Sequence, residues 1–365
     1  MNGSSFGKCF RITTWGESHG PALGVVVDGC PAGLELTEED IQKYLDLRKP
    51  GTSSVTTQRK EEDRVHILSG VFQGKTTGTP ISMLIQNTSQ HSADYGNIAY
   101  TYRPGHADYT FDAKYGFRDY RGGGRSSGRE TAARVAAGAI AIKILQNLGI
   151  EIISYTKSIR DITIDRNHFD VNEITQNAVC MPDKIAAEQA QKLIEECRMK
   201  KDSVGGVAEC RVTGLMAGLG DPVFDKLDAR LGQALFSIGA VKAVEIGDGV
   251  SVTKYYGSEN NDPFTIRDDK VVVENNRAGG ILGGISSGAD IILRAHFKPT
   301  PSIYQPQNTV TNSGEETVLE IKGRHDPCVV PRAIIVVKAM TAITILDALL
   351  DNIGTKMEHL QKIYQ

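Results

Sequence analysis

Two long apolar segments, at residues 132–148 and 331–350, place the strongest constraint on how this chain of 365 residues can fold. In the first, Ala, Val, Ile and Leu occupy nearly every side of the predicted helix. A helix that is apolar all round has to be covered on all sides. The second contains Arg332, Lys338 and Asp347, which suits a core helix better than a membrane span. We therefore expect both helices to be buried, with the first at the centre of the molecule.

Start and stop signals place the remaining elements around these helices. Ser127-Gly128-Arg129-Glu130 has the form of a capping box before the first apolar helix, and Thr37 can cap an earlier helix. No stretch of linker composition separates the elements, so we expect one α/β or α+β unit over residues 1–365. Further elements are expected as helices at residues 34–47, 184–200 and 224–237 and as strands at residues 65–71, 81–85, 205–214, 240–246 and 291–297.

Charge and cysteine usage exclude several classes of protein. The formal net charge is −3, so no overall positive field would draw the chain to nucleic acid or to an anionic membrane. The six cysteines show no C-x-x-C spacing, which predicts reduced thiols, a cytoplasmic location and no metal site. The N-terminal segment has no apolar core of signal-peptide length. Any affinity for anions must therefore come from a local concentration of basic residues.

Such a concentration occurs at residues 118–134, where five arginines are threaded through Gly122-Gly123-Gly124. Glycine lets backbone N–H groups approach an anion, and the start of the following helix adds favourable dipoles. A solvated surface loop and an RNA-binding Arg/Gly element are alternatives, but the latter is usually repeated and disordered, whereas this loop runs into a capped helix. The pattern favours a highly anionic small ligand. The arginines are Arg118, Arg121, Arg125, Arg129 and Arg134.

Two histidines lie in glycine-flanked polar loops. His19 is part of Gly16–Gly20, and His106 is part of Arg103-Pro104-Gly105-His106-Ala107-Asp108. Histidine is the side chain best matched to proton transfer near neutral pH, although a single loop histidine is more often structural than catalytic. A second glycine-rich segment, residues 279–284, has paired glycines followed by a strand, which argues against a dinucleotide-binding G-x-G-x-x-G loop.

Taken together, the motifs resemble those of the chorismate synthase family. Three segments look like its signatures, and residues 103–108 and 279–284 are also similar to family segments. These matches follow the family order over nearly the whole chain. The signature-like segments are Gly16–Gly20 continuing to Val27–Pro31, Arg125–Thr131, and Arg324–Cys328.

The resemblance implies a fold and a reaction. The fold is an α+β, β-α-β sandwich, in which central apolar helices lie between antiparallel sheets. The reaction is the anti-1,4-elimination of phosphate from 5-enolpyruvylshikimate 3-phosphate to give chorismate, the last common step of the shikimate pathway. It requires reduced FMN and brings no net redox change. The chain would then be a lyase whose cofactor supplies the difficult chemistry and whose protein part positions it.

Residue roles follow from the same resemblance. His19 corresponds to the histidine that protonates the departing phosphate, His106 to the histidine near the N1 side of the reduced flavin, and Asp326 to a carboxylate that assists proton handling at flavin N5. Arg48, Ser54 and Arg129 are expected at the substrate. The implied FMN contacts are Arg125, Ser126, Ser127, Gly239, Ala240, Gly283, Lys298, Pro299, Thr300, Pro301, Ser302 and Arg324.

Three positions depart from the usual family pattern. Ser54 stands where members usually carry a second arginine, and Gly239 stands where asparagine is common. Gly128 replaces an alanine, which should weaken the helix start only slightly. Ser54 therefore predicts weaker binding of the substrate phosphate, and Gly239 predicts one side-chain contact fewer to the flavin.

The resemblance also implies a homotetramer. Reduction of the flavin by NADPH on this chain and reduction by an external flavin reductase both remain open, and the lack of a separate reductase-like segment favours the external enzyme. The competing functions are an NAD(P)-dependent oxidoreductase, disfavoured by the glycine spacing, and a non-enzymatic RNA-binding protein, disfavoured by the net charge and the few aromatic residues.

Overall fold

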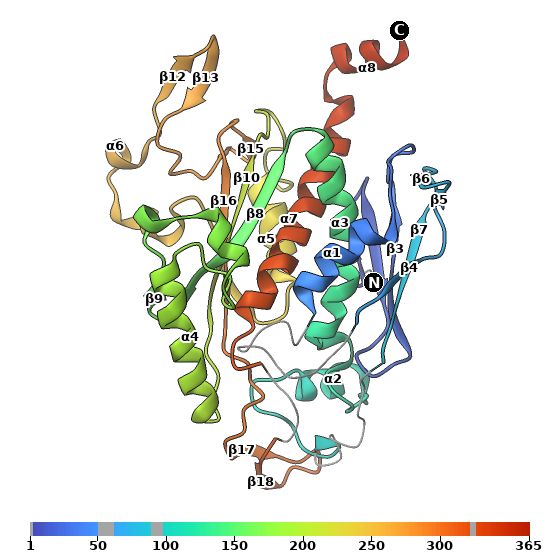
Figure 1. Cartoon of the computed structure of the whole chain (residues 1–365), viewed down its shortest axis with the longest axis vertical. Coiled ribbons are helices and arrows are strands. Elements are labelled where there is room, and N and C mark those ends of the chain that lie inside the picture. The colour runs from blue at the N-terminus through green and yellow to red at the C-terminus, as the bar shows by residue number, and fades with distance from the viewer. Residues whose placement is uncertain (1–2, 50–61, 89–97, 322–325) are drawn as a thin grey trace.

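Two antiparallel five-stranded sheets enclose two layers of helices (Figure 1). The computed structural model describes residues 3–49, 62–88, 98–321 and 326–365. The first sheet has the order β1-β2-β3-β7-β4, and the second has the order β11-β16-β10-β8-β9. The strands of the first sheet are β1 (Ser5–Phe6), β2 (Arg11–Trp15), β3 (Ala22–Asp28), β7 (Ile81–Gln86) and β4 (Val65–Ile67). Those of the second are β11 (Val241–Ile246), β16 (Ile291–Phe297), β10 (Gly206–Thr213), β8 (Glu151–Ile159) and β9 (Ile162–Thr163).

The helices between the sheets form two packed layers. Helix α3 (Thr131–Asn147) contacts β2, β3 and β7 of the first sheet, whereas α7 (Val330–Asp351) contacts β8 and β10 of the second. The two helices also pack on each other, with α1 (Glu38–Arg48) beside α3 and α5 (Leu227–Phe236) beside α7. This arrangement confirms the expected α+β sandwich with central apolar helices. The organisation of residues 1–365 as one domain stays a prediction.

Smaller elements surround this core. Four hairpins and several short helices lie at its ends, and α4 lies beside β9 at the edge of the second sheet (Figure 1). The hairpins are β5–β6 (Val71–Phe72, Lys75–Thr76), β12–β13 (Phe264–Arg267, Lys270–Val273), β14–β15 (Ile281–Leu282, Ile285–Ser286) and β17–β18 (Gln307–Val310, Glu316–Leu319). The helices are α2 (Asp108–Tyr115), α4 (Lys184–Met199), α6 (Gly257–Asn260) and α8 (Met357–Tyr364).

The close approach of α3 to α7 depends on small side chains. A Cβ atom at Gly138 of α3 would lie only 2.4 Å from the Cβ atom of Ala339 on α7. Helices with bulkier residues at their crossing point stay 8–10 Å apart, so glycine facing alanine lets these two backbones come closer. The contact explains why a helix-destabilising glycine stands inside the central helix.

Helix α7 accommodates a buried charge despite its apolar composition. The carboxylate of Asp347 accepts hydrogen bonds from the backbone N–H groups of residues 8–10, at 2.6–3.0 Å, and forms an ion pair with Arg230. Residues 330–355 are the one helical segment in the described part of the chain that is apolar and long enough to cross a membrane, but 78% of its most apolar window is buried inside the protein. This agrees with the sequence prediction of a core helix.

Two helix starts differ in their outcome. Thr37 and Asp40 form the reciprocal capping box of α1, which begins at Glu38 rather than at residue 34. The predicted box at Ser127 is wrong: Ser127 Oγ accepts from Arg129 N–H in a short 3₁₀ turn, at 3.2 Å. The carboxylate of Glu130 instead binds Thr14, which the tertiary fold brings to it, and Arg134, one turn further along α3.

Candidate active site

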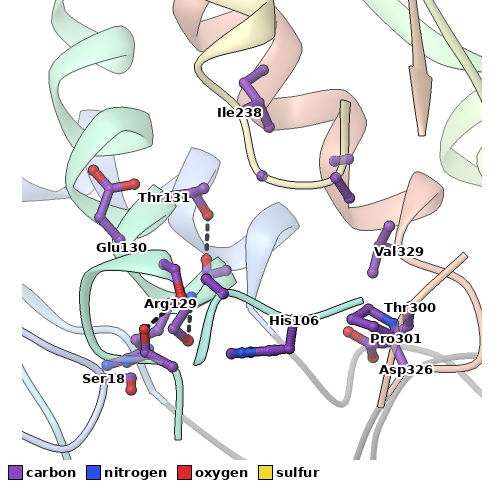
Figure 2. Close-up of a pocket in the computed structure, with 18 of the residues that line it drawn as sticks. Ser18, His106, Arg129, Glu130, Thr131, Ile238, Thr300, Pro301, Asp326 and Val329 are labelled. Atoms are coloured by element: carbon purple, nitrogen blue, oxygen red, sulfur yellow. Dashed lines mark hydrogen bonds between the residues drawn. The ribbon is translucent and has the colours of Figure 1, made fainter. Parts of the chain in front are cut away.

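A cavity of about 610 Å³ opens where α3 and α7 both begin, and the candidate site residues gather around it (Figure 2). Its wall is formed by residues drawn from six segments, at 18–19, 103–107, 122–134, 237–240, 297–302 and 326–336, with Arg48 from the end of α1. The volume lies within the range of small-molecule sites. Because helix N-termini carry a partial positive charge, two of them at one cavity favour an anionic ligand.

Basic side chains dominate the lining of this cavity. Among the described residues, seven basic side chains line it against two acidic ones, Glu130 and Asp326, although the whole chain is slightly acidic. The basic residues are Arg48, Arg103, Arg125, Arg129, Arg134, Lys298 and Arg332. The structure thus brings together the local positive charge that the composition required.

The glycine-rich loop contributes only part of its predicted arginine cluster. Arg118 turns away to pair with Asp112, and Arg121 pairs with Asp119 at the surface, 2.7 Å from Nη2 to Oδ2. Acidic partners within six residues of each arginine account for this difference. The other three arginines of the loop, at positions 125, 129 and 134, line the cavity as expected.

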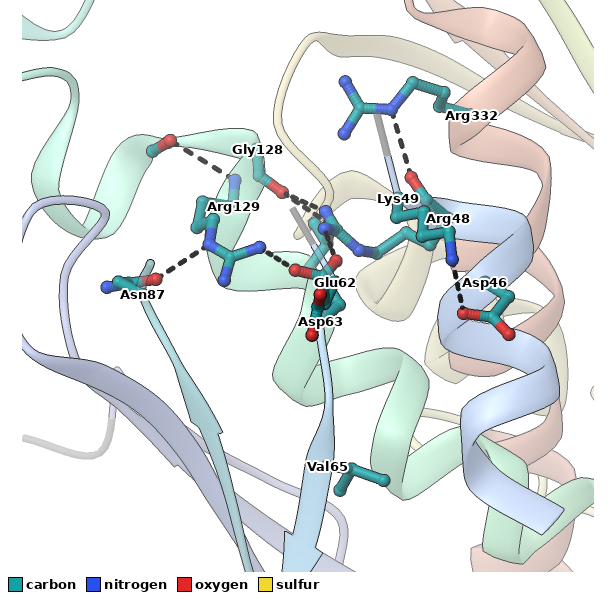
Figure 3. Close-up of polar contacts among 12 residues, drawn as sticks. Asp46, Arg48, Lys49, Glu62, Asp63, Val65, Asn87, Gly128, Arg129 and Arg332 are labelled. Carbon is teal, nitrogen blue, oxygen red and sulfur yellow. Dashed lines mark hydrogen bonds and ion pairs between the residues drawn. The ribbon is translucent and has the colours of Figure 1, made fainter. Parts of the chain in front are cut away.

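Arg48 and Arg129 meet at one carboxylate (Figure 3). Asp63 forms a buried ion pair with each of them, and Arg129 Nε also donates to Asn87 Oδ1 at 2.8 Å. Burial alone would raise the pKa of Asp63, but the two guanidinium groups lower it to about 2. Asp63 is therefore an anion that holds both arginines in place at the edge of the cavity.

His106 rests on a second buried ion pair. Its Nδ1 atom lies 2.9 Å from Asp108 Oδ1, and Arg103 Nε and Nη2 donate to the same carboxylate at 2.8 and 2.7 Å. Burial opposes ionisation, yet hydrogen bonds from Arg103 and His106 hold the pKa of Asp108 well below its usual range. This carboxylate is consequently ionised under ordinary conditions.

His19 is almost fully buried and packs against the glycine-rich loop at Gly122. Its Nδ1 atom lies 3.1 Å from Ser18 Oγ. A Cβ atom at Gly122 would lie 2.5 Å from both Cε1 and Nδ1 of His19, so only glycine allows the ring to pack there. The glycine-rich loop therefore shapes the histidine site in addition to approaching the ligand.

The loop at residues 298–302 closes the cavity against the His106 segment. Lys298 Nζ donates to Gly105 O at 2.6 Å, and Thr300, Pro301 and Asp326 all line the cavity (Figure 2). Asp326 forms an ion pair with Arg332 from the first turn of α7.

Most predicted site residues lie on this cavity. These are His19, Arg48, His106, Arg125, Ser126, Ser127, Arg129, Gly239, Ala240, Lys298, Thr300, Pro301, Ser302 and Asp326. Pro299 instead lines a neighbouring cavity of about 480 Å³, and Gly283 lies in the turn between β14 and β15, away from the wall. Ser54 and Arg324 lie outside the described residues.

Sequence reasoning missed several residues that complete the site. Arg103 and Asp108 flank His106 within the motif already identified, so their spacing was an available signal. Arg332 interrupts an apolar helix, which is a second signal. Asp63 carried no such signal, because its partners lie 15 and 66 residues away in the sequence.

Comparison with known proteins agrees with this geometry. The family model described as chorismate synthase matches residues 10–350. A chorismate synthase from Lachnospira eligens is 60% identical over 365 residues and covers 100% of both chains, and one from Methanocella arvoryzae is 55% identical over 358 residues and covers 96% of this chain and 95% of its own. A crystal structure of chorismate synthase superposes with a TM-score of 0.77 at 32% identity, covering 98% of this chain and 96% of that one.

The fold and the cavity define an α+β enzyme whose site combines basic side chains with two histidines. The comparisons give the particular family: the chain belongs to the chorismate synthases. The predicted resemblance is thereby confirmed.

Proposed function

We propose that this chain converts 5-enolpyruvylshikimate 3-phosphate to chorismate by anti-1,4-elimination of phosphate, with reduced FMN bound in the same cavity. The observation that carries the proposal is the joint placement of His19, His106 and seven basic side chains around one space of about 610 Å³. The substrate bears a phosphate and two carboxylates, and FMN bears another phosphate. A site for both ligands therefore needs a concentration of positive charge that the chain as a whole lacks.

The residues present fit a flavin phosphate and ring. Thr300 lines the cavity, and its buried Oγ1 atom makes no hydrogen bond among the described residues. Buried polar atoms are nearly always satisfied, so such atoms in a cavity wall point to a ligand. We assign the flavin to the residues predicted for it that line this wall, with the 298–302 loop and Arg125 as its main polar contacts. The chemistry that bound reduced FMN would supply is electron density and uptake of the hydrogen from C6 of the substrate.

The protein residues then have distinct tasks. Arg48 and Arg129 bind the substrate phosphate, and their fixed position beside Asp63 orients it before reaction. His19 delivers a proton to the departing phosphate, which makes phosphate a better leaving group. His106 holds a proton towards the flavin, where negative charge is stabilised. Asp326, which the ion pair with Arg332 holds in position, assists proton transfer at flavin N5.

Other parts of the proposal concern the surroundings of the site. We infer that Ser54 and Gly239 are tolerated and that the chain works in the cytoplasm as a homotetramer, without nucleic acid or membrane as partner. An external flavin reductase is the favoured source of reduced flavin, with NADPH as the alternative reductant on this chain. We also propose FMN contacts for Gly283 and Pro299, which do not line this cavity in the single chain, and these contacts are to be tested in the assembled homotetramer.

An anaerobic assay tests the function directly. The purified protein is mixed with 5-enolpyruvylshikimate 3-phosphate and chemically reduced FMN, and chorismate and phosphate are followed together. Equal release of both, absent when FMN stays oxidised, is the expected result. No release from a protein that demonstrably binds FMN would overturn the proposal and would implicate Ser54 or Gly239.

A further inference from the structure

A buried ion pair lies between the two histidines of the cavity. Arg103 and Asp108 are each only 4% exposed. Both carboxylate oxygens accept from the Arg103 guanidinium, and the Arg103 backbone N–H adds a third hydrogen bond to Oδ2 at 3.0 Å. A guanidinium that binds a carboxylate through two nitrogens fixes its plane as well as its position. Asp108 therefore cannot turn to suit His106, and it is the histidine ring that has to adapt.

This carboxylate leaves one favourable arrangement for the imidazole proton. Asp108 Oδ1 lies 2.9 Å from Nδ1 of His106 and is an acceptor, since the carboxyl group is held ionised. A second cation, Arg118 Nε, lies 3.9 Å from the same oxygen and adds to the stabilisation of the anion. An Nδ1–H group donates to this oxygen, whereas an Nδ1 lone pair would repel it.

We propose that Asp108 is a positioning residue that fixes the proton of His106 on Nδ1, so that His106 exchanges protons with the cavity only through Nε2. The role is that of a carboxylate that orients a catalytic imidazole and sets its tautomer. Neutral His106 thus presents a lone pair at Nε2, and protonated His106 presents an N–H donor at the same place. The assignment rests on the proposed function only for the statement that this proton is used in catalysis.

The same ion pair reaches the second histidine through the backbone. Arg103 Nη2 donates to Gly122 O at 2.6 Å, and Gly122 is the residue against which the His19 ring packs. Arg103 therefore holds in place the backbone that forms one wall of the His19 site. The Arg103–Asp108 ion pair therefore positions both histidines, and it connects the loop that carries His19 with the loop that carries His106.

The tautomer can be measured without substrate or cofactor. Solid-state NMR of sedimented protein carrying ¹⁵N-histidine, at about pH 9 where imidazole is ordinarily neutral, distinguishes protonated from unprotonated ring nitrogens. The spectrum of His106→Ala identifies the signals of His106. We expect Nδ1–H in the wild-type protein and a shift of most of the population to Nε2–H in Asp108→Asn. Nε2–H in the wild-type protein would overturn the proposal whether or not any variant folds.

Asp112→Asn is the matched control. Asp112 lies on the same helix, α2, and pairs with Arg118, but within the described part of the chain it neither lines the cavity nor contacts a histidine. This variant should keep the wild-type tautomer of His106. The same loss of Nδ1–H in both variants would mean that a general loosening of α2, rather than the Asp108 contact, moves the proton.

Kinetics provide the second readout. In the proposed reaction, Asp108→Asn should lower kcat on the order of ten- to hundredfold, with KM for the substrate within about twofold and FMN affinity unchanged. A loss confined to KM would contradict the positioning role. If the wild-type protein itself releases no chorismate, the proposed function fails while the tautomer result still stands, so the two failures are distinguishable.

Discussion

The guanidinium of Arg48 and the carboxylate of Asp63 form an ion pair in which the two side chains are only 2% and 0% exposed. Arg129 joins the same carboxylate, so the two arginines assigned to the substrate phosphate are held by one shared anion. Without that anion, two buried like charges would face each other and repel. Three charges that come from different parts of the fold thus depend on one another.

The first prediction concerns stability at low pH. The pKa of Asp63 is about 2 in the folded protein, against an ordinary value of 3.8. A depressed pKa stabilises the folded state above the ordinary value, here by about 2 kcal/mol, and this contribution is lost as the pH falls from about 4 to about 2. Asp63→Asn should lower the free energy of unfolding at pH 7 by at least this amount, measured by urea denaturation, and should lose less stability than the wild-type protein on acidification.

Asp161→Asn serves as its control. Asp161 is 92% exposed, and its ion pair with Arg160 lies at the surface. Such pairs contribute little, so the unfolding free energy should change by less than about 0.5 kcal/mol. Equal effects of both substitutions would show that the shared anion has no special importance.

The second prediction concerns binding of the substrate phosphate. Arg48→Ala removes one of two guanidinium groups from the proposed phosphate site and should raise KM for 5-enolpyruvylshikimate 3-phosphate about tenfold or more. Arg121→Ala is a control that should leave KM unchanged, because Arg121 lies in the arginine-rich loop but pairs with Asp119 outside the cavity. An unchanged KM in Arg48→Ala, measured from initial rates, would remove Arg48 from the phosphate site.

The third prediction separates catalysis from cofactor binding. His106→Ala should retain FMN binding, measured by flavin titration, while turnover falls on the order of a hundredfold or more. His168→Ala should leave both quantities unchanged, because its side chain is 52% exposed on a short 3₁₀ turn away from the cavity. Full activity of His106→Ala would exclude His106 from the mechanism.

The fourth prediction concerns the crossing of the central helices. Gly138→Ala places a methyl group 2.4 Å from the Cβ atom of Ala339, so α3 and α7 have to move apart. We expect a loss of about 1–3 kcal/mol in unfolding free energy. Gly232→Ala in α5 meets no atom within 4 Å and should instead be neutral or stabilising, by up to about 1 kcal/mol. A stable Gly138→Ala protein would contradict the tight crossing.

Much of the architecture could be predicted because it depends on residues that are close together in the sequence. The helices at residues 131–147 and 330–351 follow from their largely apolar composition, and the cap at Thr37 follows from Asp40, three positions along the chain. Family motifs also placed His19, His106 and the 298–302 loop at one site, and the structure brings these segments together. Such signals need no knowledge of distant contacts, since a helix face or a cap involves residues a few positions apart.

The remaining features depended on which distant residues meet. The sequence alone determined the two buried helices, the Thr37 cap and the family. Only the tertiary structure decided that Asp63 joins Arg48 to Arg129, that Glu130 leaves its predicted cap, and that Asp347 binds the backbone of residues 8–10. The physical reason is that a buried charge binds whichever partner the folded chain brings within hydrogen-bonding distance. For Asp63 and Asp347 the partners come from other elements of the fold. For Glu130 the partners are Thr14, which is distant in the sequence, and Arg134, one helical turn away.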